Sequence, residues 1–124
     1  MCLQKTKKLK AESYPLIAFY KGGTAMAEQK VSVIAQFKAP QGKVAALKKE
    51  LTALIGLSRS EPGCITYVLH QSVEDKTCFM FYENWVSKKD LDEHLKKPYI
   101  KTFMEKAGKL LASPVKIGLW EMIG

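Results

Sequence analysis

The middle of the chain constrains the fold most, because two neighbouring segments both favour β-strands. Residues 64–73 (CITYVLHQSV) and 77–86 (TCFMFYENWV) are rich in β-branched and aromatic side chains, and Glu74-Asp75-Lys76 separates them. This pattern predicts an antiparallel hairpin with a three-residue loop. If Val73 lies opposite Thr77, one face carries three cross-strand pairs: Tyr67 with Glu83, Leu69 with Phe81, and Ile65 with Trp85. The other face then carries Thr66, Val68, His70, Met80, Tyr82 and Asn84.

A strand and a helix are predicted before this hairpin. Residues 30–38 (KVSVIAQFK) alternate, so that one side carries Val31, Val33, Ala35 and Phe37 and the other carries Ile34. Apolar residues then recur at three- and four-residue steps between Val44 and Arg59, which predicts an amphipathic helix of about 18 residues. Glu61-Pro62-Gly63 ends the helix, since proline cannot extend it and glycine is free to turn.

A broken helix and a last strand are predicted after the hairpin. Ser87 is a good N-cap with Asp90 three residues later, and Leu91, His94 and Leu95 share one side of the helix that follows. Pro98 ends or kinks this helix, a helical pattern resumes over residues 99–111, and residues 115–123 form the last strand. The order β-α-β-β-α-β predicts an α+β, ferredoxin-like fold with both helices on one face of a four-stranded antiparallel sheet.

The opposite face of this sheet is predicted to be apolar. It carries Ile34, Val68, Met80, Tyr82, Trp120 and Met122. An uncovered apolar face of this kind usually marks an interface, and two copies related by a two-fold axis cover it most simply. The sequence therefore predicts a homodimer that packs sheet against sheet.

Length and charge narrow the class of protein. A chain of 124 residues is the size of one domain, and no uninterrupted apolar stretch is long enough for a membrane span. Residues 1–25 carry five lysines against Glu12, and so +4 of the net charge of +8. Arg59 is the only arginine, whereas proteins that bind nucleic acid usually use several. We expect no membrane span and no nucleic-acid partner.

The N-terminal segment is expected to lie outside the domain. It resembles a signal peptide in outline, but its apolar run at residues 15–20 is shorter than the roughly 7 to 15 residues that such a peptide needs. We expect residues 1–27 to be a disordered tail or an over-extended translation start, and residues 28–124 to be the domain.

The three cysteines, Cys2, Cys64 and Cys78, form no metal-binding motif, so we expect no metal site. We expect them to be reduced, which indicates a cytoplasmic protein.

Four motifs, taken in order, resemble the antibiotic biosynthesis monooxygenase family of small dimeric α/β-barrel proteins. They are Glu61-Pro62-Gly63-Cys64, Phe81-Tyr82-Glu83-Asn84-Trp85, Leu91-x-x-His94 and Pro98-Tyr99. The resemblance runs from about Val31 to Glu121. It implies a face-to-face dimer with a pocket between the helices and the sheet of each subunit, in a family whose members differ in chemistry.

The resemblance and the predicted register together indicate four site residues. Glu83 lies among aromatic side chains on the helix-covered face, where burial raises its pKa, and His94 on the next helix is expected to contact it. His94 assisted by Glu83 is the expected catalytic base, with Tyr67 and Trp85 as substrate contacts. Alternatively, Glu83 and His94 only satisfy each other and fix the helix in place.

The predicted function is oxidation of a quinol-like or phenolic small molecule by O2 without a cofactor. A base removes the hydroxyl proton, and the resulting anion can pass an electron to oxygen. The glycine pattern G-x-G-x-x-G, which is typical of flavin and nicotinamide sites, does not occur in the sequence. Family members that degrade haem have asparagine on the first strand, where this chain has Gln36, so the resemblance does not extend to haem chemistry. Two alternatives stay open: an isomerase of a small phosphorylated compound, and a non-catalytic dimeric module that binds a small molecule or serves in a stress response.

Overall fold

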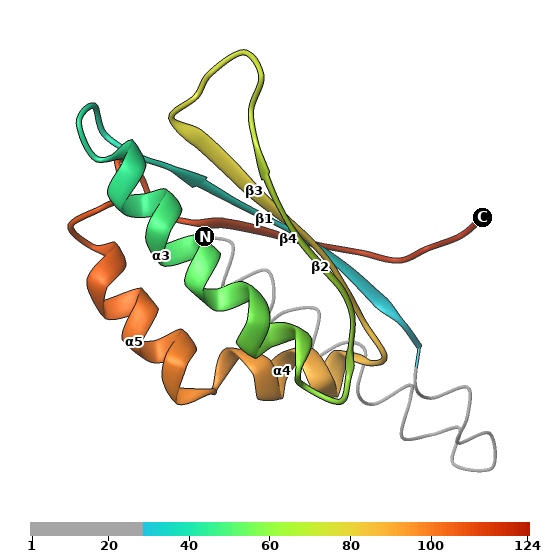
Figure 1. Cartoon of the computed structure of the whole chain (residues 1–124). Helices are drawn as coiled ribbons and strands as arrows, with labels where there is room; N and C mark the ends of the chain where they lie inside the picture. The colour runs from blue at the N-terminus through green and yellow to red at the C-terminus, as the bar shows by residue number, and fades with distance from the viewer. Residues whose placement is uncertain (1–28) are drawn as a thin grey trace, which may run out of the picture.

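The computed structural model describes residues 29–124, so the expected tail or over-extended start at residues 1–27 lies outside the described part (Figure 1). The elements follow the predicted order, and the second predicted helix is two helices. Their bounds are β1 Val31–Lys38, α3 Val44–Arg59, β2 Cys64–Gln71, β3 Cys78–Trp85, α4 Lys88–Leu95, α5 Pro98–Ala107 and β4 Lys116–Trp120.

The four strands form one antiparallel sheet in the order β2-β3-β1-β4. Within residues 29–124, the three helices all cover the same face of this sheet, and none of them covers the other face, which we call the helix-free face (Figure 1). The predicted ferredoxin-like α+β fold is therefore confirmed.

The predicted hairpin register is confirmed along most of β2 and β3. Tyr67 lies opposite Glu83, and Leu69 lies opposite Phe81. The prediction for Ile65 is wrong, because Cys64 is the residue opposite Trp85 and the register shifts between Cys64 and Thr66. An extra residue in one strand of a pair is left unpaired, and the Ile65 side chain is 49% exposed.

The predicted three-residue loop is also wrong, because β2 ends at Gln71 and β3 starts at Cys78. Polar side chains in the loop take the hydrogen bonds that a longer ladder would have used. Ser72 Oγ accepts from the backbone N–H of Asp75 at 3.0 Å, and Asp75 Oδ1 accepts from the backbone N–H of Thr77 at 3.0 Å. The Thr77 N–H therefore bonds within the loop instead of extending the ladder with Val73.

The helix ends follow local chemistry more closely than the apolar pattern. α3 has 16 residues, and the Ser60 N–H bonds back to its last turn. Ser87 caps α4 as predicted, with its Oγ accepting from the Asp90 N–H at 3.2 Å. α5 begins with Pro98 and ends at Ala107, earlier than predicted, and β4 is likewise shorter than its predicted range.

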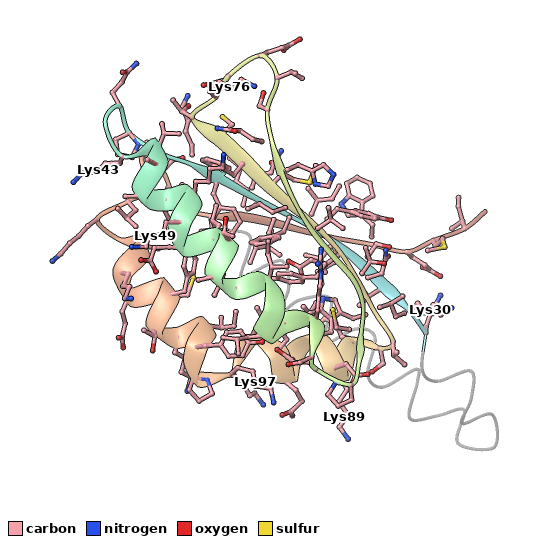
Figure 2. The ribbon with its side chains drawn as sticks, viewed as in Figure 1. Lys30, Lys43, Lys49, Lys76, Lys89 and Lys97 are labelled. Atoms are coloured by element: carbon pink, nitrogen blue, oxygen red, sulfur yellow. The ribbon has the colours of Figure 1, made fainter. Side chains whose placement is uncertain are left out.

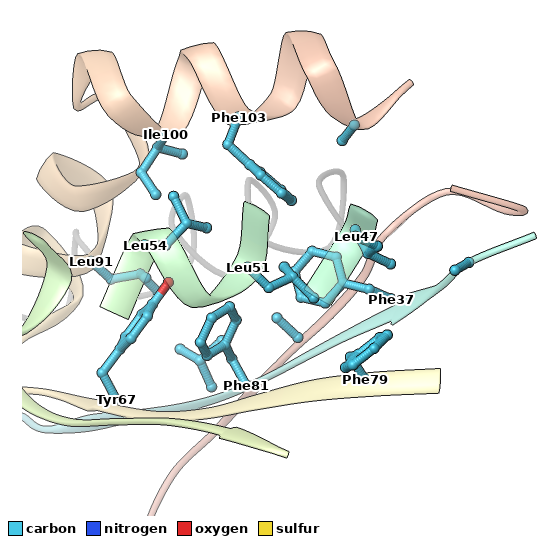
Figure 3. Close-up of a cluster of buried hydrophobic side chains, with 14 of the residues drawn as sticks. Phe37, Leu47, Leu51, Leu54, Tyr67, Phe79, Phe81, Leu91, Ile100 and Phe103 are labelled. Atoms are coloured by element: carbon cyan, nitrogen blue, oxygen red, sulfur yellow. The ribbon is translucent and has the colours of Figure 1, made fainter. Parts of the chain in front are cut away.

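The core lies between the helices and the sheet. Figure 3 shows Leu47, Leu51 and Leu54 of α3 and Phe103 of α5 pointing toward aromatic side chains of the sheet. Phe37 makes edge-to-face contacts with Phe81 and Phe103, at centroid distances of 6.0 and 5.9 Å. This packing is favourable beyond the area that it buries and holds Phe103 of α5 against β1.

The helix-free face carries the apolar side chains that the sequence placed there. Val68 and Tyr82 lie opposite each other and are each 37% exposed, and Trp120 on β4 is 60% exposed. Lysines are spread over many elements, and the six labelled in Figure 2 lie apart from one another. Within residues 29–124, no helix is long and apolar enough to cross a membrane.

Gly63 is required for close approach. Its φ is not positive, but a Cβ added there would lie 2.4 Å from Asp90 Cβ and 2.3 Å from Asp90 Cγ. The Asp90 side chain is fixed in turn, because it accepts from Ser87 Oγ at 2.8 Å. The glycine therefore lets the loop before β2 pack directly against the first turn of α4.

We predict that Gly63→Ala destabilises the protein by about 1 to 3 kcal/mol, because the new methyl group must displace Asp90 and disturb the cap of α4. Gly56→Ala is the matched control, since nothing lies within 4 Å of its added Cβ on α3. The control is expected to gain up to about 1 kcal/mol. Urea unfolding of both variants measures the effect, and equal stability would contradict this account of Gly63.

Candidate functional site

A cluster of polar and aromatic side chains lies between the helices and one end of the sheet, with all members buried except the partly buried Glu61 and Tyr99. We call it the buried polar cluster, and it consists of Ser58, Glu61, Tyr67, Glu83, Trp85, His94 and Tyr99. The four predicted site residues all belong to it. Tyr67, Glu83, Trp85 and His94 are at most 4% exposed.

Glu83 and Trp85 reach the cluster from the same face of β3. Trp85 Nε1 donates to Glu83 Oε1 at 2.8 Å, and Tyr67 lies opposite Glu83 on β2. Burial raises the pKa of Glu83 to about 7, with a further rise from Glu61 and an opposing effect of the Trp85 hydrogen bond. The predicted carboxyl group among aromatic rings is confirmed, with the indole as its hydrogen-bond partner.

His94 lies in the cluster but is paired differently from the prediction. Its Nδ1 lies 2.8 Å from Glu61 Oε2, whereas we expected Glu83 as the partner. Its ring packs on Trp85 at a centroid distance of 4.5 Å and on Tyr67 at 5.6 Å. The predicted pairing of His94 with Glu83 is therefore wrong, because the indole takes the Glu83 carboxyl and a second carboxylate approaches His94 from the loop before β2.

Glu61, Ser58 and Tyr99 are residues of the cluster to which the sequence analysis gave no chemical role. The Tyr99 hydroxyl donates to Glu61 Oε2 and lies 3.5 Å from Ser58 Oγ. The sequence pattern indicates for Glu61 only a place in the segment that ends the first helix. The signal was present, because Glu61 and Tyr99 both stand in the motifs that carry the family resemblance.

Burial favours the uncharged forms of four groups of the cluster, Glu83, His94, Tyr67 and Tyr99. It lowers the pKa of His94, and the hydrogen bond and charge of Glu61 only partly oppose this effect. It raises the pKa of both Tyr67 and Tyr99 above the ordinary tyrosine value. The cluster therefore offers a neutral imidazole beside phenolic hydroxyl groups in apolar surroundings, which is a suitable arrangement for accepting a proton from a weak acid.

A separate cavity of about 650 Å³ lies at the helix-free face of the sheet. None of the four predicted site residues lines it. Its lining includes Gln36, Lys38, His70, Met80 and Lys116. The described residues contain no group of three or more histidine, cysteine or acidic side chains that could hold a metal ion. The expected pocket between helices and sheet stays a prediction.

Comparisons with known proteins agree with this architecture. The family model for antibiotic biosynthesis monooxygenase matches residues 30–106. Protein Rv0793 of Mycobacterium tuberculosis, which bears the name "Putative monooxygenase Rv0793", is 34% identical over 87 residues, covering 70% of this chain and 85% of that protein. Protein sll1783 of Synechocystis sp. is 39% identical over 79 residues, but the match covers only 54% of its length and 60% of this chain.

Solved structures give the same result. The crystal structure of PA3566 from Pseudomonas aeruginosa matches with a TM-score of 0.74 and 32% identity, covering 77% of this chain and 96% of that chain. The structure of Rv0793 also gives a TM-score of 0.74, with 30% identity over 77% of this chain and 97% of that chain. On the family model, the sequence relatives and the shared fold together, the chain belongs to the antibiotic biosynthesis monooxygenase family.

Proposed function

We propose that the protein is a monooxygenase that needs no cofactor and oxidises a quinol-like or phenolic small molecule with O2. The observation that carries this proposal is the imidazole of His94, which is buried against Trp85 and Tyr67 in surroundings that lower its pKa. The name of the relative Rv0793 supports the same class of reaction. His94 is the proposed base, Trp85 the aromatic wall and Tyr67 the hydroxyl contact of the substrate.

The proposed reaction draws all its electrons from the substrate. His94 takes the proton of a phenolic hydroxyl group, and the phenolate passes one electron to O2. The superoxide and the aryl radical combine into a carbon–oxygen bond, and the O–O bond of the peroxide then breaks. One oxygen atom stays in the product as a quinone oxygen, and the C–H bond at the attacked carbon breaks as this carbonyl forms. The other oxygen atom leaves as water with two protons, the one returned by His94 and the one released from the C–H bond. A hydroquinone thus becomes a hydroxyquinone, and one O2 is consumed for each substrate.

Access to His94 requires movement of the helices, because the ring is 2% exposed. The helical cover has a break at Lys96 and Lys97, between the end of α4 and the start of α5. We propose that an aromatic substrate enters by displacing this junction and stacking on Trp85.

The burial of His94 also favours a second candidate function. In this alternative the cluster only stabilises the fold of a non-catalytic binding module.

We propose that the working form is a homodimer in the cytoplasm. The helix-free face exposes Val68, Tyr82 and Trp120, and the cavity at this face gives the surface relief that a second copy can fill. The free thiols of Cys64 and Cys78 support a reducing compartment.

We expect the protein to consume O2 with a panel of hydroquinones, and His94→Ala to lower kcat/KM by about 100-fold or more through loss of the base. His70→Ala is the matched control, because His70 is exposed on the helix-free face. An oxygen electrode with product analysis measures both. Equal rates for His94→Ala and wild type, or no uptake by wild type with any substrate, would reject the oxygenase and favour the non-catalytic module.

For the dimer, we predict that Tyr82→Lys shifts the protein from dimer to monomer at micromolar concentration, because the charge falls within an apolar interface. Met104→Lys on α5 is the control, since Met104 is a similarly exposed apolar residue away from the sheet. Analytical ultracentrifugation gives the masses. A monomeric wild type would exclude the proposed interface.

Glu83 is proposed to assist by fixing the Trp85 indole and by staying protonated below about pH 7. Its folded-state pKa of about 7 exceeds the ordinary 4.5, so the folded state binds the proton more tightly and stability falls as the pH rises between these values. We predict that wild type loses about 3 kcal/mol relative to Glu83→Gln across this range. Chemical denaturation at several pH values tests this, with exposed Glu93→Gln as control. A pH-independent difference would contradict the protonated carboxyl group.

A further inference from the structure

We infer that Glu61 is the positioning residue of the proposed site: its carboxylate binds Nδ1 of His94 and so leaves Nε2 as the atom that accepts the substrate's proton. This inference rests on the proposed function only for the role of Nε2. The pairing itself is a property of the fold and can be tested without a substrate.

The geometry around Glu61 gives a carboxylate with two donors. Oε2 lies 2.8 Å from His94 Nδ1, and the same oxygen accepts from the Tyr99 hydroxyl. The His94 and Glu61 side chains are 3% and 9% exposed. A buried carboxylate oxygen accepts hydrogen bonds and cannot donate them, so a neutral imidazole must carry its proton on Nδ1 to satisfy this contact. The lone pair of Nε2 is then available as a base.

The chain brings Glu61 to this place through backbone contacts that do not involve His94. Glu61 follows α3, and its backbone N–H bonds to the Ser58 carbonyl at 3.1 Å. Two residues later, the Gly63 carbonyl accepts from the Val86 N–H at 2.9 Å, which ties the same loop to the end of β3. The backbone around Glu61 is therefore held on both sides by hydrogen bonds that do not depend on His94.

Charged, titratable and aromatic side chains from several elements surround His94. Glu61 approaches from the loop after α3, Lys97 from the junction of α4 and α5, and Tyr99 from α5. The sheet contributes Tyr67 from β2 and Trp85 from β3, with Glu83 bonded to the indole. Burial lowers the pKa of His94, the hydrogen bond and charge of Glu61 raise it, and Lys97 lowers it. Removing the Glu61 charge should therefore lower the pKa of His94 further.

The test uses the full chain labelled with ¹⁵N-histidine, with His70→Ala to assign the two ring signals. In wild type we expect the neutral Nδ1–H tautomer of His94. In Glu61→Gln we expect the pKa of His94 to fall by about one pH unit or more, because an ionised neighbour within hydrogen-bond reach is lost. Tyr99→Phe is the matched control, since it removes a bond to Glu61 but leaves the carboxylate beside His94.

Two results would overturn the inference. The first is an Nε2–H tautomer of His94 in wild type, which can be measured even if Glu61→Gln fails to fold. The second is an unchanged His94 pKa in a folded Glu61→Gln or Glu61→Ala variant, as a purely structural role predicts. If wild type oxidises a quinol, Glu61→Gln should also move the acid limb of kcat/KM to lower pH. If wild type oxidises nothing, the proposed function fails while the tautomer result still decides the role of Glu61.

Discussion

The close approach of the loop before β2 to helix α4 is the constraint on which the buried polar cluster depends. No side chain fits at Gly63, so the backbone of the loop lies directly against Asp90 in the first turn of α4. The same loop bonds to Val86 at the end of β3 and brings the Glu61 carboxylate to His94. One backbone contact thus fixes how a helix, two strands and a carboxylate meet.

Much of the fold could be predicted because alternation and helical periodicity report directly on which face is buried. The positions of Tyr67 opposite Glu83 and of Leu69 opposite Phe81 follow from this alternation. The bulge beside Cys64 and the six-residue loop could not be predicted in the same way. Both arise where side chains or an unpaired residue interrupt the hydrogen-bond ladder between the strands. The order of apolar and polar residues does not indicate where such interruptions occur.

Four members of the site could be predicted from the sequence, but Glu61, Ser58 and Tyr99 and the hydrogen-bond pairings could not. Strand alternation and the position of His94 on the next helix were sufficient to bring Glu83, Trp85 and His94 together. The choice of partner depends on side-chain geometry in three dimensions. In this geometry the indole of Trp85, and not His94, donates the hydrogen bond to Glu83. Glu61 lies 33 residues from His94 in sequence, and no local pattern connects them. Long-range hydrogen bonds of this kind are decided by packing, which a one-dimensional pattern does not contain.

The buried polar cluster and the hairpin loop occupy opposite ends of the same two strands. Cys64 and Trp85 pair at the cluster end, whereas Gln71 and Phe79 pair beside the loop at residues 72–77. At about 3.3 Å per residue, the intervening strand separates the two ends by roughly 20 Å. Insertions or sequence changes in this loop can therefore reshape the rim of the helix-free face while the buried polar cluster at the far end stays intact.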